Sequence, residues 1–376
     1  MILGGISLLN YKNLQEVNTA FSPKINCFIG SNGMGKTNLL DAVYYLSFCK
    51  SAVTASDSSN IMHDAPFFML QGCYQSDSGI DSEVSCGLKR GEKKQFRRDG
   101  KLYERLSDHI GSVPLVMVSP ADSELIAGGS EERRRFMDVV ISQYDKEYLS
   151  ALIRYNRALQ QRNVMLRGEY APDGEYAPDG EMMSLIEDMM VAEAVRIHAG
   201  RRQFVEELVP IFSQFHSAIT GDSEQVSLRY RSHMNDEDLG VLLAASRADD
   251  RNLGYTSKGV HRDELVMQLG GYPIKKEGSQ GQNKSFLVSL KLAQFDFLRR
   301  KGGETPLLLL DDIFDKLDSG RVEQIVNLVS GDGFGQIFIT DVNREHIDAI
   351  LDRIDSGYRL FEVKKGEVEL LKEREI

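Results

Sequence analysis

The chain has 376 residues and a formal net charge of −11, with 41% hydrophobic and 27% charged residues. This composition is ordinary for a globular protein, and the length allows two domains or one large domain with an insertion. The longest aliphatic run, Leu307–Leu310, is far too short to span a bilayer, and the first residues do not form a signal peptide. We therefore expect a cytoplasmic protein with no membrane partner.

The acidic balance argues against a surface that is coated with nucleic acid. It leaves room for a local basic face, because DNA affinity follows the phosphates that are actually contacted. The four cysteines show no Cys-x-x-Cys spacing, which fits a reducing compartment and gives no sign of a zinc site.

The first distinctive stretch is a glycine-rich loop between an expected strand, Lys24–Ile29, and an expected helix with Leu39, Leu40, Val43 and Leu46 at helical spacing. Leu3–Asn10 is an earlier strand, and a polar turn is expected between the two strands. The loop fits the pattern G-x-x-x-x-G-K-[ST], which binds nucleotide phosphates at a helix N-terminus. The ATP-binding residues that it predicts are Gly30, Ser31, Asn32, Gly33, Met34, Gly35, Lys36, Thr37 and Asn38.

Two side chains of this loop have specific expected roles. Lys36 would reach the β- and γ-phosphates, and the Thr37 hydroxyl would be a ligand of Mg²⁺. A glycine turn without a ligand is the alternative, and the strand before it and the helix after it make that the minority interpretation.

Residues 67–105 contain a basic segment within an expected antiparallel sheet of strands Phe67–Gln75, Glu83–Arg90 and Lys93–Arg98. Eight basic residues face three acidic ones between positions 89 and 105. One interpretation is a solvated edge whose charges discourage aggregation, and an equally weighted one is a DNA contact. The candidate DNA-binding residues, the basic hairpin, are Lys89, Arg90, Lys93, Lys94, Arg97 and Arg98.

Residues 131–218 keep a helical period and predict a helical hairpin. Its expected tip is a duplicated hexapeptide, Glu169–Gly174 and Glu175–Gly180, which we interpret as a tolerated loop expansion. The helices carry many arginines, including Arg133, Arg162 and Arg201, for which a solvated face is the default interpretation.

A second candidate motif lies near the end of the chain, where Leu307–Leu310 runs directly into Asp311 and Asp312. A continuous apolar run is typical of a parallel strand that is buried on both faces, and ligands bind at the carboxyl end of such strands. Asp311 would hold Mg²⁺, through water, and Asp312 would orient or deprotonate the attacking water. Gln336–Thr340 is another expected strand, with a helix from about residue 343.

Between the two motifs lie 274 positions, counted from Thr37 to Asp311, so a large insertion separates them. Just before the second motif, an amphipathic helix begins at Ser279, Gln280, Gly281 and Gln282. Such a start is a second anion-binding helix N-terminus. One γ-phosphate does not need two such termini, so we expect this one to serve the nucleotide of a second subunit.

Several further motifs accompany these two. They are Ser119–Asp122, Gly128-Gly129 with Arg133–Asp138, Gly254–Thr256, Gly259–Leu265 and Leu317-Asp318. Together the motifs resemble the ABC-type ATPase heads of the SMC/Rad50 group and, within it, the RecF family, over essentially the whole chain. Asp312 replaces the glutamate of most ABC proteins, and Val260 and Asn283-Lys284 depart from the usual pattern.

The resemblance implies an α/β fold, an ABC-type P-loop ATPase head with a helical second domain. The implied ATPase lobe is residues 1–118 plus 290–376, and the implied helical lobe is residues 119–289. Residues 279–282 would be the ABC signature that contacts ATP in trans, Asp318 would end the D-loop, and Thr340 would stand at the switch position. Lys36 and Asp312 would be the catalytic residues.

The resemblance also implies a function, that of a slow, DNA-stimulated ATPase that dimerises on ATP. It would bind duplex and gapped DNA and help to load recombinase in DNA repair, the SOS response and replication restart. The implied cofactors are ATP and Mg²⁺, and the implied partners are RecR and RecO. The alternatives are another SMC/Rad50-like ATPase, a transporter's nucleotide-binding subunit, a P-loop phosphotransferase and a related nuclease.

Overall fold

The computed structural model describes residues 1–168, 180–314, 317–331, 333–352 and 356–375. All but the last residue of the duplicated hexapeptide lies outside these ranges. The chain forms two compact units. The first unit comprises residues 1–123, 214–223 and 279–376, and the second unit comprises residues 124–213 and 224–278. Residues 119–123, 214–223 and 279–289, which the sequence analysis assigns to the helical lobe, thus cluster with the first unit.

One sheet of the first unit is antiparallel, with strand order β2-β1-β4-β5-β6-β7. The predicted antiparallel strands are present, but the polar turn predicted before Lys24 is wrong in part. Leu14–Ala20 is a strand that pairs with β1, and its buried residues Leu14 and Val17 are separated by the polar pair Gln15 and Glu16, which hides the alternation. The strands are β1 (Ile2–Tyr11), β2 (Leu14–Ala20), β4 (Phe67–Gln75), β5 (Asp81–Lys89), β6 (Gln95–Arg98) and β7 (Lys101–Leu102).

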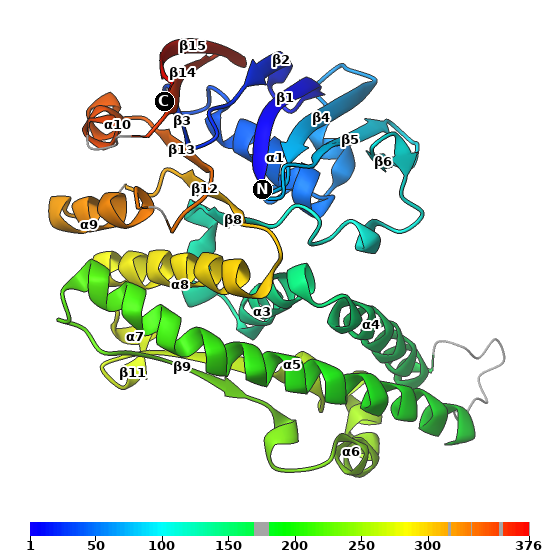
Figure 1. Ribbon diagram of the computed structural model, residues 1–376. Helices are drawn as coiled ribbons and strands as arrows, with labels where there is room; N and C mark the ends of the chain where they lie inside the picture. Colours follow the sequence, from blue (N-terminus) through cyan, green and yellow to red (C-terminus); the bar gives the residue numbers. More distant parts are fainter. Residues whose placement is uncertain (169–179, 315–316, 332, 353–355, 376) are drawn as a thin grey trace. The chain divides into compact units, whose positions relative to one another are not determined.

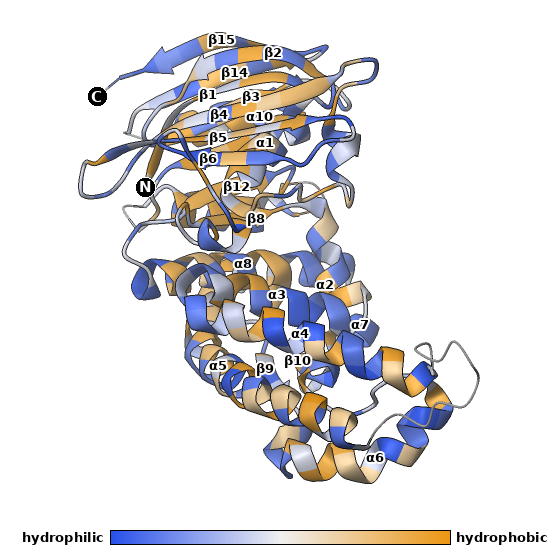
Figure 2. Ribbon diagram, turned by 90° about the vertical axis from the view of Figure 1, so that its right-hand side faces the viewer, coloured by the Kyte–Doolittle hydropathy of each residue, from blue (hydrophilic) through white to orange (hydrophobic). Residues whose placement is uncertain are grey.

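The other sheet of this unit has the order β15-β14-β3-β13-β12-β8, and its members from β14 to β8 run parallel. Every residue of β3, β8, β12 and β13 is buried, as continuous apolar runs predict for a parallel sheet, and Figure 2 colours β8 and β12 mostly as hydrophobic. The strands are β3 (Ile25–Ile29), β8 (Leu115–Val118), β12 (Leu307–Asp311), β13 (Ile337–Asp341), β14 (Tyr358–Lys364) and β15 (Glu367–Arg374).

The helices of the first unit connect and cover these strands (Figure 1). Helix α1 contacts strands of both sheets, and α8 packs on β8. Every residue of α8 from Ser285 to Leu298 is buried, so this helix is enclosed all round and is not the amphipathic surface helix that its sequence indicates. The helices are α1 (Lys36–Phe48), α8 (Gln280–Lys301), α9 (Ser319–Val329) and α10 (Arg344–Leu351), with short helices η1 (Asp57–Asn60), η2 (Leu106–Asp108) and η3 (Pro120–Ser123).

The second unit contains the predicted helical region and a small antiparallel sheet of order β11-β10-β9. Its helices are α2 (Glu124–Ala127), α3 (Ser130–Tyr144), α4 (Lys146–Arg167), α6 (Leu239–Leu253), α7 (Ile274–Glu277) and most of α5 (Gly180–Thr220), with short helices η4 (His233–Asn235) and η5 (Val260–Arg262). The strands are β9 (Val226–Arg231), β10 (Glu264–Leu269) and β11 (Tyr272–Pro273). Among the described residues, none of the helices has the length and apolar character of a membrane span.

Two arginines of the second unit are buried in ion clusters, so the solvated face assumed for them is wrong. Arg201, 2% exposed, pairs with Asp138 at 2.9 Å and with Asp263 at 2.8 Å, and its Nη1 also donates to the Val260 carbonyl oxygen. Arg162, which is fully buried, pairs with Asp250 at 2.7 Å and Glu187 at 3.0 Å. The acidic partners come from distant segments, so the sequence around each arginine gives no sign of them.

Replacing Arg201 with Met should destabilise the second unit strongly. The change leaves Asp138 and Asp263 without their cation, and breaking a buried pair in this way costs about 3–5 kcal/mol. Urea unfolding followed by far-ultraviolet circular dichroism measures the loss. The adjacent Arg202→Met is the matched control, because Arg202 is 60% exposed and lies 4.0 Å from Glu206, so its change should stay within about 0.5 kcal/mol. Equal effects of the two variants would contradict the assignment of Arg201 to the core.

Candidate nucleotide-binding site

The glycine-rich loop leads from β3 into α1, which begins at Lys36. Gly33 has φ of +80°, and a Cβ there would meet no atom within 4 Å, so the backbone conformation and not crowding requires glycine. Lys36 is only 4% exposed, and its Nζ donates to the carbonyl oxygens of Gly30 at 2.7 Å and Ser31 at 3.3 Å. The lysine therefore lies inside the curve of the loop, with open space on the outer side of Gly33.

Two turns from opposite ends of the sequence hold this loop. In the turn between β1 and β2, the Asn13 amide donates to the Gly33 carbonyl oxygen at 3.2 Å and accepts from the Asn38 amide at 2.7 Å. In the turn between β14 and β15, the Gly366 N–H donates to the Met34 carbonyl oxygen at 3.0 Å. The loop conformation thus depends on the start and the end of the first unit's chain.

The predicted second motif meets the loop through one carboxylate oxygen. Oδ1 of Asp311 accepts hydrogen bonds from the hydroxyls of Thr37 at 3.0 Å and Thr340 at 2.7 Å. The Asp312 N–H in turn donates to the Thr340 hydroxyl at 3.1 Å. The structure therefore brings together both halves of the predicted site across a separation of 274 residues. Thr340, predicted at the switch position, lies buried against Asp311.

The charges of the two aspartates are only partly compensated. Burial raises the pKa of Asp311, although the Thr340 and Thr37 hydroxyls and the Lys36 charge act in the opposite direction. Burial, followed by the charge of Asp311, raises the pKa of Asp312. Within the described chain, Oδ1 of Asp312 is buried without a hydrogen-bond partner. A hard divalent cation with phosphate and water ligands fits this pair together with the Thr37 hydroxyl.

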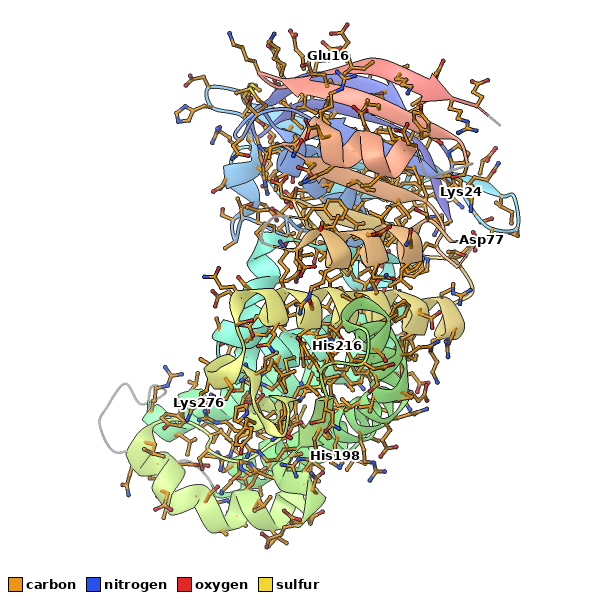
Figure 3. The ribbon with its side chains drawn as sticks, turned by 90° about the vertical axis from the view of Figure 1, so that its left-hand side faces the viewer. Glu16, Lys24, Asp77, His198, His216 and Lys276 are labelled. Atoms are coloured by element: carbon orange, nitrogen blue, oxygen red, sulfur yellow. The ribbon has the colours of Figure 1, made fainter. Side chains whose placement is uncertain are left out.

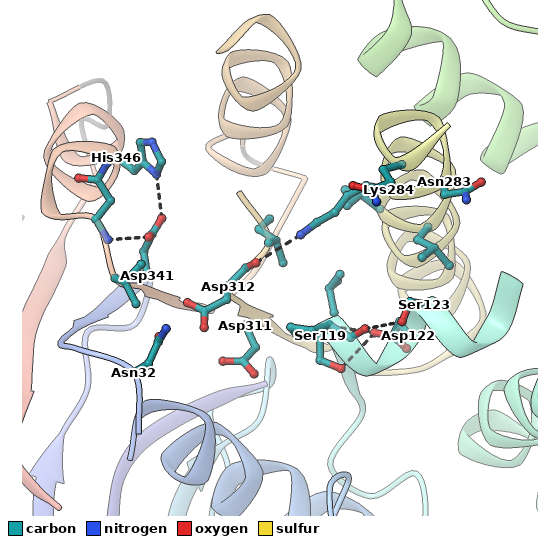
Figure 4. A pocket seen from close by; sticks show the side chains of 18 residues that line it. Asn32, Ser119, Asp122, Ser123, Asn283, Lys284, Asp311, Asp312, Asp341 and His346 are labelled. Carbon is teal, nitrogen blue, oxygen red and sulfur yellow. Dashed lines mark hydrogen bonds and ion pairs between the residues drawn. The ribbon is translucent and has the colours of Figure 1, made fainter. Parts of the chain in front are cut away.

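An open cavity of about 620 Å³ lies beside these aspartates (Figure 4). Ligand sites usually have volumes of roughly 300–1,000 Å³. The cavity is lined from the loop, from the carboxyl ends of β8, β12 and β13, and from the first turns of α8. Its polar lining residues are Asn32, Ser119, Asp122, Ser123, Gln280, Asn283, Lys284, Asp311, Asp312, Asp341, Asn343 and His346.

Some polar side chains of this cavity have no role in the sequence analysis. Nζ of Lys284 donates to the Asp312 carbonyl oxygen at 3.4 Å, so this atypical residue lies beside the second motif. Nδ1 of His346 donates to the Asp341 carboxylate at 3.1 Å. Asp341 ends a buried parallel strand, a position that could have been found from sequence. The partners of Lys284 and His346 could not have been found, because they depend on tertiary contacts.

Residues 279–282 begin α8 as a capped helix. The Ser279 hydroxyl accepts from the Gln282 N–H at 3.3 Å, and the Gln282 side chain accepts from the Ser279 N–H at 2.9 Å. A Cβ on Gly281 would lie 3.5 Å from Nη1 of Arg321, an ordinary contact, so no described residue demands glycine there. Arg321 follows Asp318, the N-cap of α9, and donates to the Ser285 hydroxyl at 2.7 Å. Arg321 also pairs with Asp318 at 3.2 Å and thus links the start of α9 to the second turn of α8.

The basic side chains of the hairpin are less available for a DNA contact than its composition indicates. Lys94 points inward, where its Nζ donates to the Cys49 carbonyl oxygen at 2.5 Å and pairs with Asp57 at 2.7 Å. Arg90 donates to the carbonyl oxygens of Ala65 and Met62, and Lys89 pairs with Glu92 at 2.6 Å. The other members carry weaker contacts: Arg97 donates to Gln95, Arg98 lies 3.8 Å from Asp99, and Lys93 is exposed.

Known proteins resemble this chain over its full length. The family model of the AAA ATPase domain matches residues 1–162. The DNA replication and repair protein RecF of Phocaeicola vulgatus is 61% identical over 99% of both chains. The same protein of Bacteroides thetaiotaomicron is 60% identical over 97% of this chain and 98% of its own length. This chain belongs to the RecF family.

Solved structures agree with the RecF assignment. A structure of the recombination mediator protein RecF-ATPrS in the RecFOR pathway has a TM-score of 0.86 at 27% identity, covering 98% of both chains. An Smc head domain with an extended coiled coil, derived from Pyrococcus furiosus, has a TM-score of 0.58 at 15% identity and shows a likeness of fold alone, covering 100% of this chain and 96% of its own. The predicted α/β fold of an ATPase head is confirmed, and SMC heads share this fold.

The raised carboxyl pKa values predict that the site reduces stability. The penalty of a raised pKa is absent below the ordinary carboxyl value of ~4 and complete once the pH exceeds the folded-state value. Asp312→Asn should therefore raise the melting temperature at pH 7.5 without Mg²⁺ or nucleotide, and the gain should shrink as the pH falls to ~4.5. Asp312 is only partly buried, so solvent screens the repulsion and the rise should be small, about 2 °C.

Differential scanning calorimetry in metal-free buffer measures this difference. Glu16→Gln is the matched control. Glu16 is exposed on β2 (Figure 3), and its replacement removes one negative charge from the same unit. A lower melting temperature for Asp312→Asn at pH 7.5, or an equal rise for both variants, would show that the aspartate pair is not under strain.

Proposed function

We propose that this protein is an ATP-dependent recombination mediator that dimerises on ATP and binds duplex and gapped DNA. The observation that supports it best is the shared carboxylate of Asp311, which joins the Thr37 hydroxyl and Thr340 at one point. RecF relatives of 60% and 61% identity carry the DNA replication and repair name, and a RecF structure is described with ATP in the RecFOR pathway. Family membership favours this function over a transporter subunit, a phosphotransferase or a nuclease.

The loop residues would bind the nucleotide phosphates. Backbone N–H groups from Gly30 to Asn38 would surround the phosphates at the start of α1, and Lys36 would exchange its two carbonyl partners for phosphate oxygens. Thr37 and Asp311 would hold Mg²⁺, which supplies charge neutralisation to the phosphates when bound. Asp312, whose pKa is raised by burial and by Asp311, would orient the attacking water and accept its proton.

The start of α8 would complete the site of a second subunit. Gly281 is a glycine that no atom in the described part of its own chain requires, which supports a close approach from outside. Ser279 and the free end of the helix would present a hydroxyl and backbone donors to the partner's γ-phosphate. Arg321 would hold this turn in place through Ser285, and Asp318 would lie beside it at the end of the D-loop.

Hydrolysis would then report that two subunits have closed on DNA. A slow, DNA-stimulated turnover follows from a site whose residues are complete only in the dimer. RecR and RecO are the proposed protein partners, and the cytoplasm is the proposed location. The proposed helical lobe is residues 119–289.

Two substitutions separate nucleotide binding from turnover. Lys36→Ala should abolish tight ATP binding, because it removes a charge-assisted contact worth about 1.5–3 kcal/mol. Asp312→Asn should keep binding and lose turnover, because an amide hydrogen-bonds but cannot accept the proton. Calorimetric titration with ATP and a phosphate-release assay measure the two effects. Unchanged ATP affinity in Lys36→Ala, or normal hydrolysis by Asp312→Asn, would refute the respective role.

A substitution at Ser279 tests the contribution in trans. Ser279→Arg should leave ATP binding intact and prevent ATP-dependent dimerisation, because the arginine fills the space meant for the partner's nucleotide. Sedimentation with ATP, ADP and neither measures association. The matched control is Ser330→Arg at the C-cap of α9, a half-buried helix-terminal serine remote in sequence from both motifs.

Mixing the Lys36→Ala and Ser279→Arg proteins gives a sharper test of the contribution in trans. A dimer of one Lys36→Ala subunit and one Ser279→Arg subunit contains one site with both wild-type residues and one site with both lesions. Partial ATP-dependent association or hydrolysis, absent from either variant alone, is the expected result. Normal dimerisation of Ser279→Arg by itself would show that residues 279–282 are only a capped helix.

A further inference from the structure

A cluster of positive charges lies in the second unit, around the motif Gly259–Leu265 to which the proposed function gives no role. Arg231 ends β9 and His233 begins η4. Lys258 lies two residues before η5, and Arg262 ends η5. Burial lowers the pKa of His233, and the charges of Lys258, Arg262 and Arg231 lower it further while Asp263 opposes them. Arg231, Lys258 and Arg262 therefore each lie within electrostatic reach of His233.

Two acidic residues beside this cluster, Asp263 and Glu264, are already bound by other residues. Asp263 is fully buried, and its Oδ2 accepts from Nη1 of Arg201 at 2.8 Å and from the Tyr230 hydroxyl at 2.5 Å. Glu264, the cross-strand neighbour of Arg231, holds both Nε and Nη2 of Arg133, at 2.6 and 2.9 Å. Within the residues that the structure covers, no carboxylate pairs with Arg231, Lys258 or Arg262.

The cluster is also held in an outward-facing arrangement. The Arg262 guanidinium lies 5.1 Å from the ring centroid of Tyr255, which is 44% exposed, and donates to the Thr256 carbonyl oxygen at 3.3 Å. Arg231 is exposed, and Arg229, two residues earlier on the same face of β9, is exposed as well. The strand and the turn thus present a row of cations and not a single charge.

Such a row matches one kind of ligand. Guanidinium groups bind phosphate oxygens in a fixed fork, and a lysine adds a mobile point charge. Several cations spaced along a strand and a turn fit repeated phosphates better than one small anion, because the charge of duplex DNA also repeats along its axis. We propose that Arg229, Arg231, Lys258 and Arg262, the cationic row, bind the phosphodiester backbone of duplex DNA. This inference rests on the DNA-binding part of the proposed function and places a contact in the second unit.

Charge-removing variants test the cationic row. Arg231→Gln, Lys258→Gln, Arg262→Gln and the triple variant keep polar side chains and remove only the positive charge. Binding of a fluorescent duplex oligonucleotide is measured by anisotropy across a range of NaCl concentrations, with ATP and Mg²⁺ present. Each single change should weaken binding about fivefold, and the triple change should reduce the slope of log affinity against log salt by about 2–3.

Arg202→Gln is the matched control, since Arg202 is a 60% exposed arginine of the same unit that lies 4.0 Å from Glu206. It should leave both affinity and slope unchanged. Far-ultraviolet circular dichroism and melting temperature check that the variants fold, and Arg231→Gln, at an exposed strand position, carries the test if the triple variant is unstable.

The results distinguish this inference from the proposed function. ATP affinity is measured in the same variants and should stay unchanged. If wild-type protein binds no duplex, the DNA-binding function itself fails, and this inference fails with it. If wild type binds DNA and loses affinity on Lys93→Gln with Arg97→Gln in the basic hairpin, but the triple variant retains wild-type affinity and slope, only the cationic row is overturned. The cationic row is also overturned if the triple variant binds duplex DNA more weakly with an unchanged salt slope. The same holds if the triple variant loses binding to an acidic protein and keeps its affinity for DNA.

Discussion

The site depends on one carboxylate oxygen, Oδ1 of Asp311, which accepts the hydroxyls of Thr37 and Thr340 at once. Through it the first turn of α1 and the ends of β12 and β13 are fixed against one another. Burial raises the pKa of Asp311, and the two hydroxyls offset only part of that effect. The parallel sheet can be understood as the scaffold that makes this convergence possible, because its buried strands deliver their carboxyl ends to one edge.

Sequence reasoning succeeded where the signal is local and failed where it is tertiary. The glycine-rich loop and the run Leu307–Asp312 are continuous patterns, and both lie where their periodicity predicts. The strand Leu14–Ala20 was missed because two polar residues interrupt its alternation. Lys284 appeared only as a departure from a motif, and its contact with Asp312 requires α8 and β12 to be folded together.

The arginines of the second unit illustrate the same limit with charge. Arg162 and Arg201 look no different in sequence from Arg231 and Arg262. The first pair is buried against aspartates and glutamates from other segments, which makes the unit's core ionic. Asp263 and Glu264, which lie beside the second pair, are engaged by Arg201 and Arg133 instead. Composition counts all four alike, and only the pairing separates the buried structural arginines from the exposed ones.

The position of β3 has a consequence for how the protein is made. This strand, which leads into the glycine-rich loop, pairs only with β13 and β14, and the loop itself is tied to Gly366. From Ile29 to Ile337 the ribosome must add about 300 residues, which takes roughly 15–60 s at bacterial rates. During that time the apolar strand β3 lacks both of its sheet neighbours, and an unpaired apolar strand of this kind favours aggregation. A chain that terminates before β12 and β13 lacks Asp311 and Thr340, and its glycine-rich loop has no second half of the site.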